Sequence, residues 1–175
     1  MNSIIVYFSR AGSNWVEDGV KNIEVGNCEL LAQFIQKQTD ADIFKLEQKK
    51  QYTNDYHKAT EEAKEDLKNN NFLELKSMPD VSKYDTIYLG YPIWWDTMPM
   101  AVATFLKNSN LSGKIIIPFC SHEGSGIANS VADLQKYCPN SIVKECFEIR
   151  GYKCQNIDND KDVQSSIIKW INDNK

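Results

Sequence analysis

Short runs of apolar, β-branched residues alternate along the chain with longer segments in which apolar residues recur every three to four positions. The short runs predict five strands, at residues 3–8, 41–46, 84–90, 114–119 and 142–149. The longer segments predict five helices, at residues 28–38, 54–70, 99–106, 127–137 and 161–172. Strand and helix are therefore expected to alternate from one end of the chain to the other.

The first helical segment shows the pattern clearly. Leu30, Leu31, Phe34 and Ile35 fall on one face of a helix, which we expect to pack on a sheet. Asn27 stands just before this segment and is predicted to be its N-cap. The second helical segment is rich in charged residues, so we expect a largely exposed helix there.

Alternation of this kind is typical of α/β proteins, in which right-handed crossovers place helices on both faces of a parallel sheet. The run at residues 114–119 is so apolar that its strand is expected to be covered on both faces. With 175 residues and 42% hydrophobic content, the chain suits one domain spanning residues 1–175. The predicted fold is a three-layer, doubly wound, five-stranded parallel α/β sheet.

Composition narrows the possible partners. The formal net charge of −4 disfavours nucleic acid, because non-specific binding to phosphate backbones depends on clustered Lys and Arg. No apolar run approaches the roughly 18 residues that a membrane span requires, and the first residues enter a predicted strand without the pattern of a signal peptide. We therefore expect a cytoplasmic protein with no membrane insertion.

The cysteines indicate neither a disulfide framework nor a zinc site. Their number is odd and no two of them form a CxxC pair, so we expect reduced and mostly buried thiols and no metal. The five residues are Cys28, Cys120, Cys138, Cys146 and Cys154.

In an open parallel sheet, ligands bind beyond the carboxyl ends of the strands, so the loops after the first, third and fourth strands are the candidate site. The first loop, residues 9–14, is followed by a stretch that reaches the helix start at Asn27 and Cys28. Hydroxyl groups, small residues and a helix N-terminus together favour a phosphate. The motifs of Walker-type and dinucleotide-type sites are absent. A serine-rich turn with an N-cap is the alternative explanation.

The loop after the third strand reads GYPIWWDTMP and includes Trp94 and Trp95. Two adjacent indoles at the carboxyl edge of a sheet suit the face of a flat conjugated ring. Packing within the core, with one indole facing inward and the other outward, is the alternative.

The loop after the fourth strand reads CSHEGSG, and its glycines allow backbone amides to approach a ligand closely. A polar ring edge is the expected occupant. Ser121, His122 and Glu123 also suggest a hydrolase, but the sequence lacks the GxSxG nucleophile elbow, and neighbours in one loop rarely form a triad.

Together the loops suit one phosphate, one planar aromatic system and one polar ring edge. YFSRAG with GNCE, then GYPIWW, then FCSHEGSG occur in this order, and the chain resembles the flavodoxin family, specifically members with an insertion in the first loop. The resemblance covers nearly the whole chain. It implies the strand order 2-1-3-4-5 and non-covalently bound flavin mononucleotide (FMN) as cofactor.

The resemblance also assigns residues to the cofactor, with no metal and no dedicated catalytic residue. It implies that the phosphate is held by Ser9, Arg10, Ala11, Gly12, Asn27 and Cys28. It implies that the flavin ring is lined by Pro92, Ile93, Trp94, Trp95 and Asp96, and its other edge by Ser121, His122, Glu123, Gly124, Ser125 and Gly126.

Two positions depart from the family pattern. Cys28 replaces a usual Thr, so a hydroxyl donor to phosphate becomes a weak thiol donor and we expect weaker cofactor retention. Asp96 replaces a common Gly in a loop where a peptide of flavodoxins turns over on flavin reduction. A non-glycine residue at positive φ costs roughly 1 kcal/mol or more, which favours two-electron over one-electron cycling.

The function implied by the resemblance is electron transfer between redox partner proteins, a reductase and an acceptor, by a monomer or weak dimer. The alternative is an FMN-dependent NAD(P)H oxidoreductase acting on quinones or similar acceptors. A phosphorylation-dependent receiver would need an acidic cluster after the first strand, and a low-molecular-weight phosphatase a Cys and Arg closing one loop there; neither is present. The role of residues 14–25 stays open.

Overall fold

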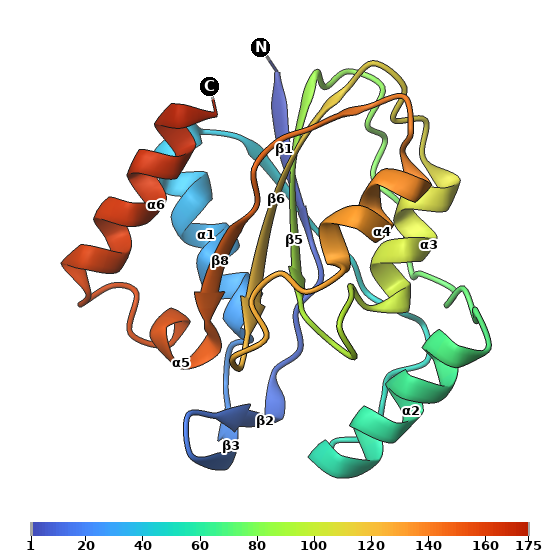
Figure 1. Ribbon diagram of the computed structural model, residues 1–175, viewed down its shortest axis with the longest axis vertical. Coiled ribbons are helices and arrows are strands. Elements are labelled where there is room, and N and C mark those ends of the chain that lie inside the picture. Colours follow the sequence, from blue (N-terminus) through green and yellow to red (C-terminus); the bar gives the residue numbers. More distant parts are fainter. Residues whose placement is uncertain (1, 175) are drawn as a thin grey trace.

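The computed structural model describes residues 2–174, and its central feature there is a six-stranded sheet in which every strand pair is parallel (Figure 1). The strands are β1 (Ser3–Tyr7), β4 (Asp42–Lys45), β5 (Thr86–Pro92), β6 (Ile115–His122), β7 (Ile142–Val143) and β8 (Phe147–Arg150). They lie in the order β4, β1, β5, β6, with β7 and β8 both paired to the outer edge of β6. The predicted parallel sheet and its order 2-1-3-4-5 are confirmed, with the last strand in two pieces.

Six helices lie in the described part of the chain. They are α1 (Asn27–Thr39), α2 (Tyr56–Lys68), α3 (Met100–Asn108), α4 (Ser130–Tyr137), α5 (Gly151–Cys154) and α6 (Lys161–Asp173). Helices α1 and α6 cover one face of the sheet, and α3 and α4 cover the other, which confirms the predicted three layers (Figure 1). Helix α2 is set apart from them, beyond the carboxyl ends of the strands (Figure 1).

The alternation of side chains in β1 explains why two core clusters form. Ile4 and Val6 face the cluster that includes the α3 residues, while Ile5 and Tyr7 face the cluster that includes the α1 and α6 residues. Because successive side chains of a strand point to opposite faces, a fully apolar strand needs helices on both.

The segment of unassigned role, residues 14–25, contains most of a β-hairpin. Strands β2 (Gly12–Val16) and β3 (Gly19–Ile23) are antiparallel and joined by a two-residue turn in which Glu17 has a φ of 54°. Both strands are short, and their apolar residues do not alternate regularly with polar ones, so the hydrophobic pattern did not predict them.

The structure corrects several expected boundaries. Asn27 is the first residue of α1 and not its N-cap; Gly26 is the N-cap and offers no side chain. Pro99, expected to be the first residue of a helix, precedes α3 as its N-cap. The predicted strand at 142–149 is interrupted between β7 and β8. Strand β6 extends to His122, so three residues expected in the fourth loop belong to the sheet.

All five cysteines are free, and four of them are buried. Within residues 2–174, no helix combines the length and the apolar character needed to cross a bilayer. Helix α6 is an example. Four of its last eight residues are polar or charged, because its apolar residues occupy only one face of the helix.

Candidate functional site

The three predicted loops meet at the carboxyl edge of the sheet, because β1, β5 and β6 are parallel neighbours that end there (Figure 1). Direct contacts connect them. The amide N–H of Ile93 donates to the carbonyl of Ser121 at 2.8 Å. The side chains of Cys28 and Ser121 share a hydrogen bond at 3.2 Å between Sγ and Oγ. The sequence thus identified segments that lie together in space.

The first loop packs against the N-terminus of α1. The hydroxyl of Ser9 accepts a hydrogen bond from the amide of Glu29 at 3.1 Å, so this helix is capped by a side chain from a distant segment. Gly26 allows the close approach: a Cβ there would lie 2.7 Å from the carbonyl oxygen of Arg10. In residues 2–174 no acceptor takes up the amides of Asn27 and Cys28. This end of α1 can therefore accept an anion.

The Cys28 side chain does not contribute to that anion site. Cys28 is only 1% exposed, and its thiol shares a hydrogen bond with the Ser121 hydroxyl in the core. Burial raises the pKa of the thiol to about 12, so it stays neutral. The expectation that this thiol serves as a weak donor to phosphate is wrong for this structure, because only the backbone amide of Cys28 is available.

The Arg10 guanidinium is also used elsewhere. It donates to the carbonyl oxygens of Ser13, Thr53 and Asn54, the last two at 2.9 and 3.2 Å. Ala11 is exposed, and Gly12, with a φ of 84°, begins the hairpin. The first loop therefore divides into a part that faces α1 and a part that faces the hairpin and α2.

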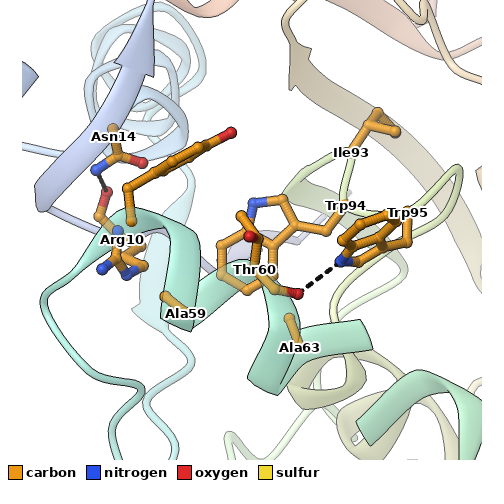
Figure 2. A pocket seen from close by; sticks show the side chains of 9 residues that line it. Arg10, Asn14, Ala59, Thr60, Ala63, Ile93, Trp94 and Trp95 are labelled. Carbon is orange, nitrogen blue, oxygen red and sulfur yellow. Dashed lines mark hydrogen bonds between the residues drawn. The ribbon is translucent and has the colours of Figure 1, made fainter. Parts of the chain in front are cut away.

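The two tryptophans of the second loop have different surroundings. Trp94 is partly buried, with its ring edge-on to Phe8 and to Tyr52 at centroid distances of 5.4 and 5.9 Å. Trp95 is 42% exposed, and its indole N–H donates to the carbonyl of Thr60 in α2 at 2.8 Å (Figure 2). One indole thus joins the core while the other makes a contact with α2.

Trp95 and Asp96 form a tight two-residue turn. Their φ angles are 52° and 64°, and the backbones of Trp94 and Thr97 exchange hydrogen bonds across it. Positive φ at both central residues is typical of a type I′ turn, which favours Asn or Asp followed by Gly. Asp96 thus already has the left-handed backbone conformation, which costs a non-glycine residue roughly 1 kcal/mol or more. Its carbonyl accepts from the Asn129 amide at 2.8 Å, which holds the turn in place.

Replacing Asp96 with glycine should raise the free energy of unfolding by about 0.5–1 kcal/mol, because glycine adopts positive φ without a Cβ clash. Urea denaturation of the two proteins measures the difference. Asp96→Ala is the control and should not stabilise, since alanine keeps the Cβ. Equal stabilisation by alanine would show that the backbone angle is not the cause.

The third loop is held by His122. Its Nδ1 accepts the amide N–H of Gly124 at 3.0 Å, and its Nε2 lies 3.0 Å from a carboxylate oxygen of Glu148. This pairing requires a neutral imidazole with its proton on Nε2. Burial lowers the pKa of His122, and Arg150 lowers it further, while Glu148 opposes both.

Acidification should loosen the third loop through this residue. A protonated Nδ1 cannot accept the Gly124 amide, so protonation breaks that bond. Because the folded pKa lies below the unfolded value, the stability contributed by neutral His122 is fully present above about pH 6.5 and is lost as pH falls through the folded pKa. Between pH 7.5 and pH 5, the Tm of His122→Asn should decrease less than that of the native protein. The asparagine side chain can accept the Gly124 amide hydrogen bond but does not titrate. An equal decrease would contradict this role.

Glu123 stands at the junction of the third loop and α1. Its side chain and that of Asn27 meet at the buried Gly151. A Cβ added to Gly151 would lie 2.3 Å from a carboxyl oxygen of Glu123 and 2.3 Å from the side-chain amide nitrogen of Asn27. Loss of solvent at this position raises the pKa of Glu123 to about 7, although Arg150 acts in the opposite direction. Ser125 is exposed, and Gly124 and Gly126 have φ angles of 128° and 63° that favour glycine.

A cavity of about 300 Å³ lies between the first two loops and α2 (Figure 2). The loops contribute Arg10, Asn14, Ile93, Trp94 and Trp95, and α2 contributes Tyr56, Ala59, Thr60 and Ala63. Pro92 and the residues at 121–126 do not line it. The cavity thus has one aromatic wall that the sequence predicted and a second wall, from α2, that it did not.

Sequence reasoning missed the α2 wall because α2 has the charged composition of an exposed helix. A weak signal was available: Ala59 and Ala63, at helical spacing of four, are its two buried residues and leave room beneath the helix. Asn14 lies at the end of the predicted first loop but was not assigned to the cofactor, and the structure places it in strand β2 of the hairpin. Its side chain donates to the carbonyl of Arg10 at 3.2 Å, which places it beside the first loop (Figure 2).

A family model described as flavodoxin matches residues 3–173. The chain belongs to the flavodoxin family. No curated protein matches this sequence. The match includes the hairpin and α2, so both segments lie within the extent of the flavodoxin family domain.

Solved structures of low sequence identity share the fold. A candidate flavoprotein of Bacteroides eggerthii DSM 20697 has 24% identity and a TM-score of 0.73, covering 99% of this chain and 97% of that one. One from Bacteroides uniformis ATCC 8492 has 23% identity and a TM-score of 0.75, with coverages of 98% and 97%. A flavoprotein of Lactobacillus acidophilus NCFM in complex with FMN has 17% identity and a TM-score of 0.64, with coverages of 90% and 96%.

Proposed function

We propose that this flavodoxin family protein binds FMN non-covalently at the carboxyl edge of its sheet and uses it to transfer electrons. The observation that carries the proposal is the aromatic cavity, which adjoins the first loop through Arg10 and Asn14. That loop in turn packs on the open N-terminus of α1. The proposed phosphate site therefore adjoins the proposed site for a planar ring through the first loop, as a mononucleotide requires.

The residues present fit FMN. The amides of Asn27 and Cys28 and the close approach at Gly26 suit a phosphate, since helix N-termini attract anions. Ile93, Trp94 and Tyr56 border a space suited to a flat ring. When bound, FMN supplies the redox chemistry, and the protein binds it, orients it and excludes water.

The test is a titration of the flavin-free protein with FMN, followed by quenching of flavin fluorescence. We expect saturable binding of one FMN per chain and a yellow complex that survives gel filtration. Riboflavin, which lacks the phosphate, should bind more weakly. Failure to bind either flavin would refute the proposal.

We propose that the partners are proteins, a reductase and an acceptor, and that the chain works as a monomer or weak dimer in the cytoplasm. Stopped-flow reduction of the flavin-loaded protein by a purified flavodoxin reductase tests the carrier role. Rapid reduction by the reductase, and none by NAD(P)H alone, is the expected outcome.

One observation favours an enzymatic alternative, an NAD(P)H oxidoreductase acting on quinones. Helix α2 closes one side of the cavity, and Trp95 is bonded to it, which restricts access by a large partner more than by a small molecule. In such a reaction a hydride and a proton pass from NAD(P)H and solvent to a quinone, giving NAD(P)⁺ and hydroquinone. Steady NADPH oxidation by the loaded protein, accelerated by quinone, would support this alternative over the carrier.

A further inference from the structure

Arg10 occupies an unusual position for a residue expected to hold phosphate. Its guanidinium extends from the first loop to the chain just before α2, where it donates to the carbonyl oxygens of Thr53 and Asn54 at 2.9 and 3.2 Å. The guanidinium also donates to the carbonyl oxygen of Ser13 at the start of the hairpin. The five donors of a guanidinium form a planar fork, so one side chain can bridge three segments in this way.

Neighbouring contacts converge on the same junction. The side-chain oxygen of Asn54 accepts the amide of Ser13 at 3.4 Å. The rings of Trp15 and Tyr56 lie 6.2 Å apart, which joins the hairpin to the first turn of α2. Gly12 leaves room for this arrangement, since a Cβ there would lie 2.4 Å from the same Asn54 oxygen.

Among the described residues, helix α2 has few other attachments to the body of the protein; one is the hydrogen bond that the Tyr52 hydroxyl donates to Asp66 at 2.7 Å. Ala59 and Ala63 are its buried residues, and both are small. At its middle, Thr60 accepts the Trp95 indole and the Lys64 ammonium lies 4.6 Å from the Trp95 ring centre. The position of α2 over the cavity therefore depends mainly on Arg10 at its start and on Trp95 at its middle.

We propose that Arg10 is a positioning residue that fixes the start of α2, and with it Tyr56, as a wall of the flavin cavity, and that it is not a ligand of the phosphate. The proposal rests on the proposed function for the identity of the flavin. The attachment of α2 by Arg10 does not, because it can be measured on the flavin-free protein.

The first measurement is amide hydrogen exchange of flavin-free Arg10→Gln. Loss of the fork should accelerate exchange about tenfold or more in residues 53–63, with the central strands unchanged. Lys21→Gln is the control, because it removes an exposed cation from the neighbouring hairpin. Unchanged exchange in Arg10→Gln would overturn the proposal. If this variant does not fold, Arg10→Lys replaces it, since a lysine keeps the charge but not the fork.

The second measurement compares FMN with riboflavin. A positioning residue acts on the ring cavity, so Arg10→Gln should weaken both ligands by the same factor, about tenfold, and leave the ratio of their affinities unchanged. If Arg10 were a ligand of the phosphate, Arg10→Gln would weaken FMN more than riboflavin and so lower the ratio of their affinities. That result would overturn the proposal. Should the native protein bind neither flavin, the proposed function fails, and the exchange measurement alone decides the role of Arg10.

Discussion

Replacing Gly26 with alanine should lower the affinity for FMN by about 100-fold, or roughly 3 kcal/mol, while the protein remains folded. Gly26 has a φ of −68°, which alanine adopts without strain, so the effect comes from contact alone. The added Cβ would lie 2.2 Å from the Ser9 hydroxyl and 2.7 Å from the Arg10 carbonyl oxygen. The hydroxyl can rotate away, but the carbonyl belongs to the backbone, so the first loop must retreat from α1.

That retreat would separate the two halves of the proposed phosphate site. The loss of affinity is measured by fluorescence titration, with circular dichroism as the check on folding. Gly19→Ala is the control: a Cβ at Gly19 meets nothing within 4 Å, so this variant should bind FMN like the native protein. Native affinity in Gly26→Ala would show that the phosphate lies elsewhere.

Replacing Glu123 with glutamine should tighten FMN binding at pH 8 on the order of tenfold and have little effect at pH 6. The carboxyl lies beside Asn27 at the start of α1, and burial raises its pKa to about 7. Above that pH it is a carboxylate that repels a phosphate dianion. Below it, the carboxyl is neutral and resembles the glutamine of the variant.

Charges around Glu123 modify this behaviour without removing it. Arg150 favours the carboxylate, and Tyr56 on α2 and Cys154 on α5 are further titratable groups that interact with it. FMN affinity should fall from pH 6 to pH 8 more steeply for the native protein than for Glu123→Gln. The phosphate of FMN, whose second pKa is near 6, contributes to the slope of both proteins equally.

Two further comparisons identify the cause. Riboflavin has no phosphate, so its affinity should differ little between the native protein and Glu123→Gln at either pH. Glu61→Gln, on the exposed face of α2, should leave the slope for FMN unchanged. Identical slopes for the native protein and Glu123→Gln would contradict the role of Glu123.

The same raised pKa has a consequence for stability. A carboxyl whose folded pKa exceeds its unfolded value contributes stability that is fully present below the unfolded pKa and is lost as pH rises through about 7. When the pH rises from 6 to 8, the Tm of Glu123→Gln should therefore decrease less than the Tm of the native protein.

The sequence itself determined the sheet, its helices and the three loops of the site. Runs such as Ile4 to Val6 are apolar at every position, and only a strand covered on both faces buries all of them. Once the strands are parallel, their carboxyl ends share one edge, so the loops after β1, β5 and β6 must meet there. Local pattern and elementary topology are sufficient for this part.

Only the tertiary structure decided what individual side chains in those loops do. Cys28 turns to Ser121, Arg10 reaches carbonyls more than 40 residues away, and α2 becomes a wall of the cavity. These contacts join segments that are remote in the sequence, and none of them is encoded in a hydrophobic period or a local motif. A polar side chain binds whichever partner the folded chain brings within hydrogen-bonding distance, so its role follows from the packing of the whole molecule.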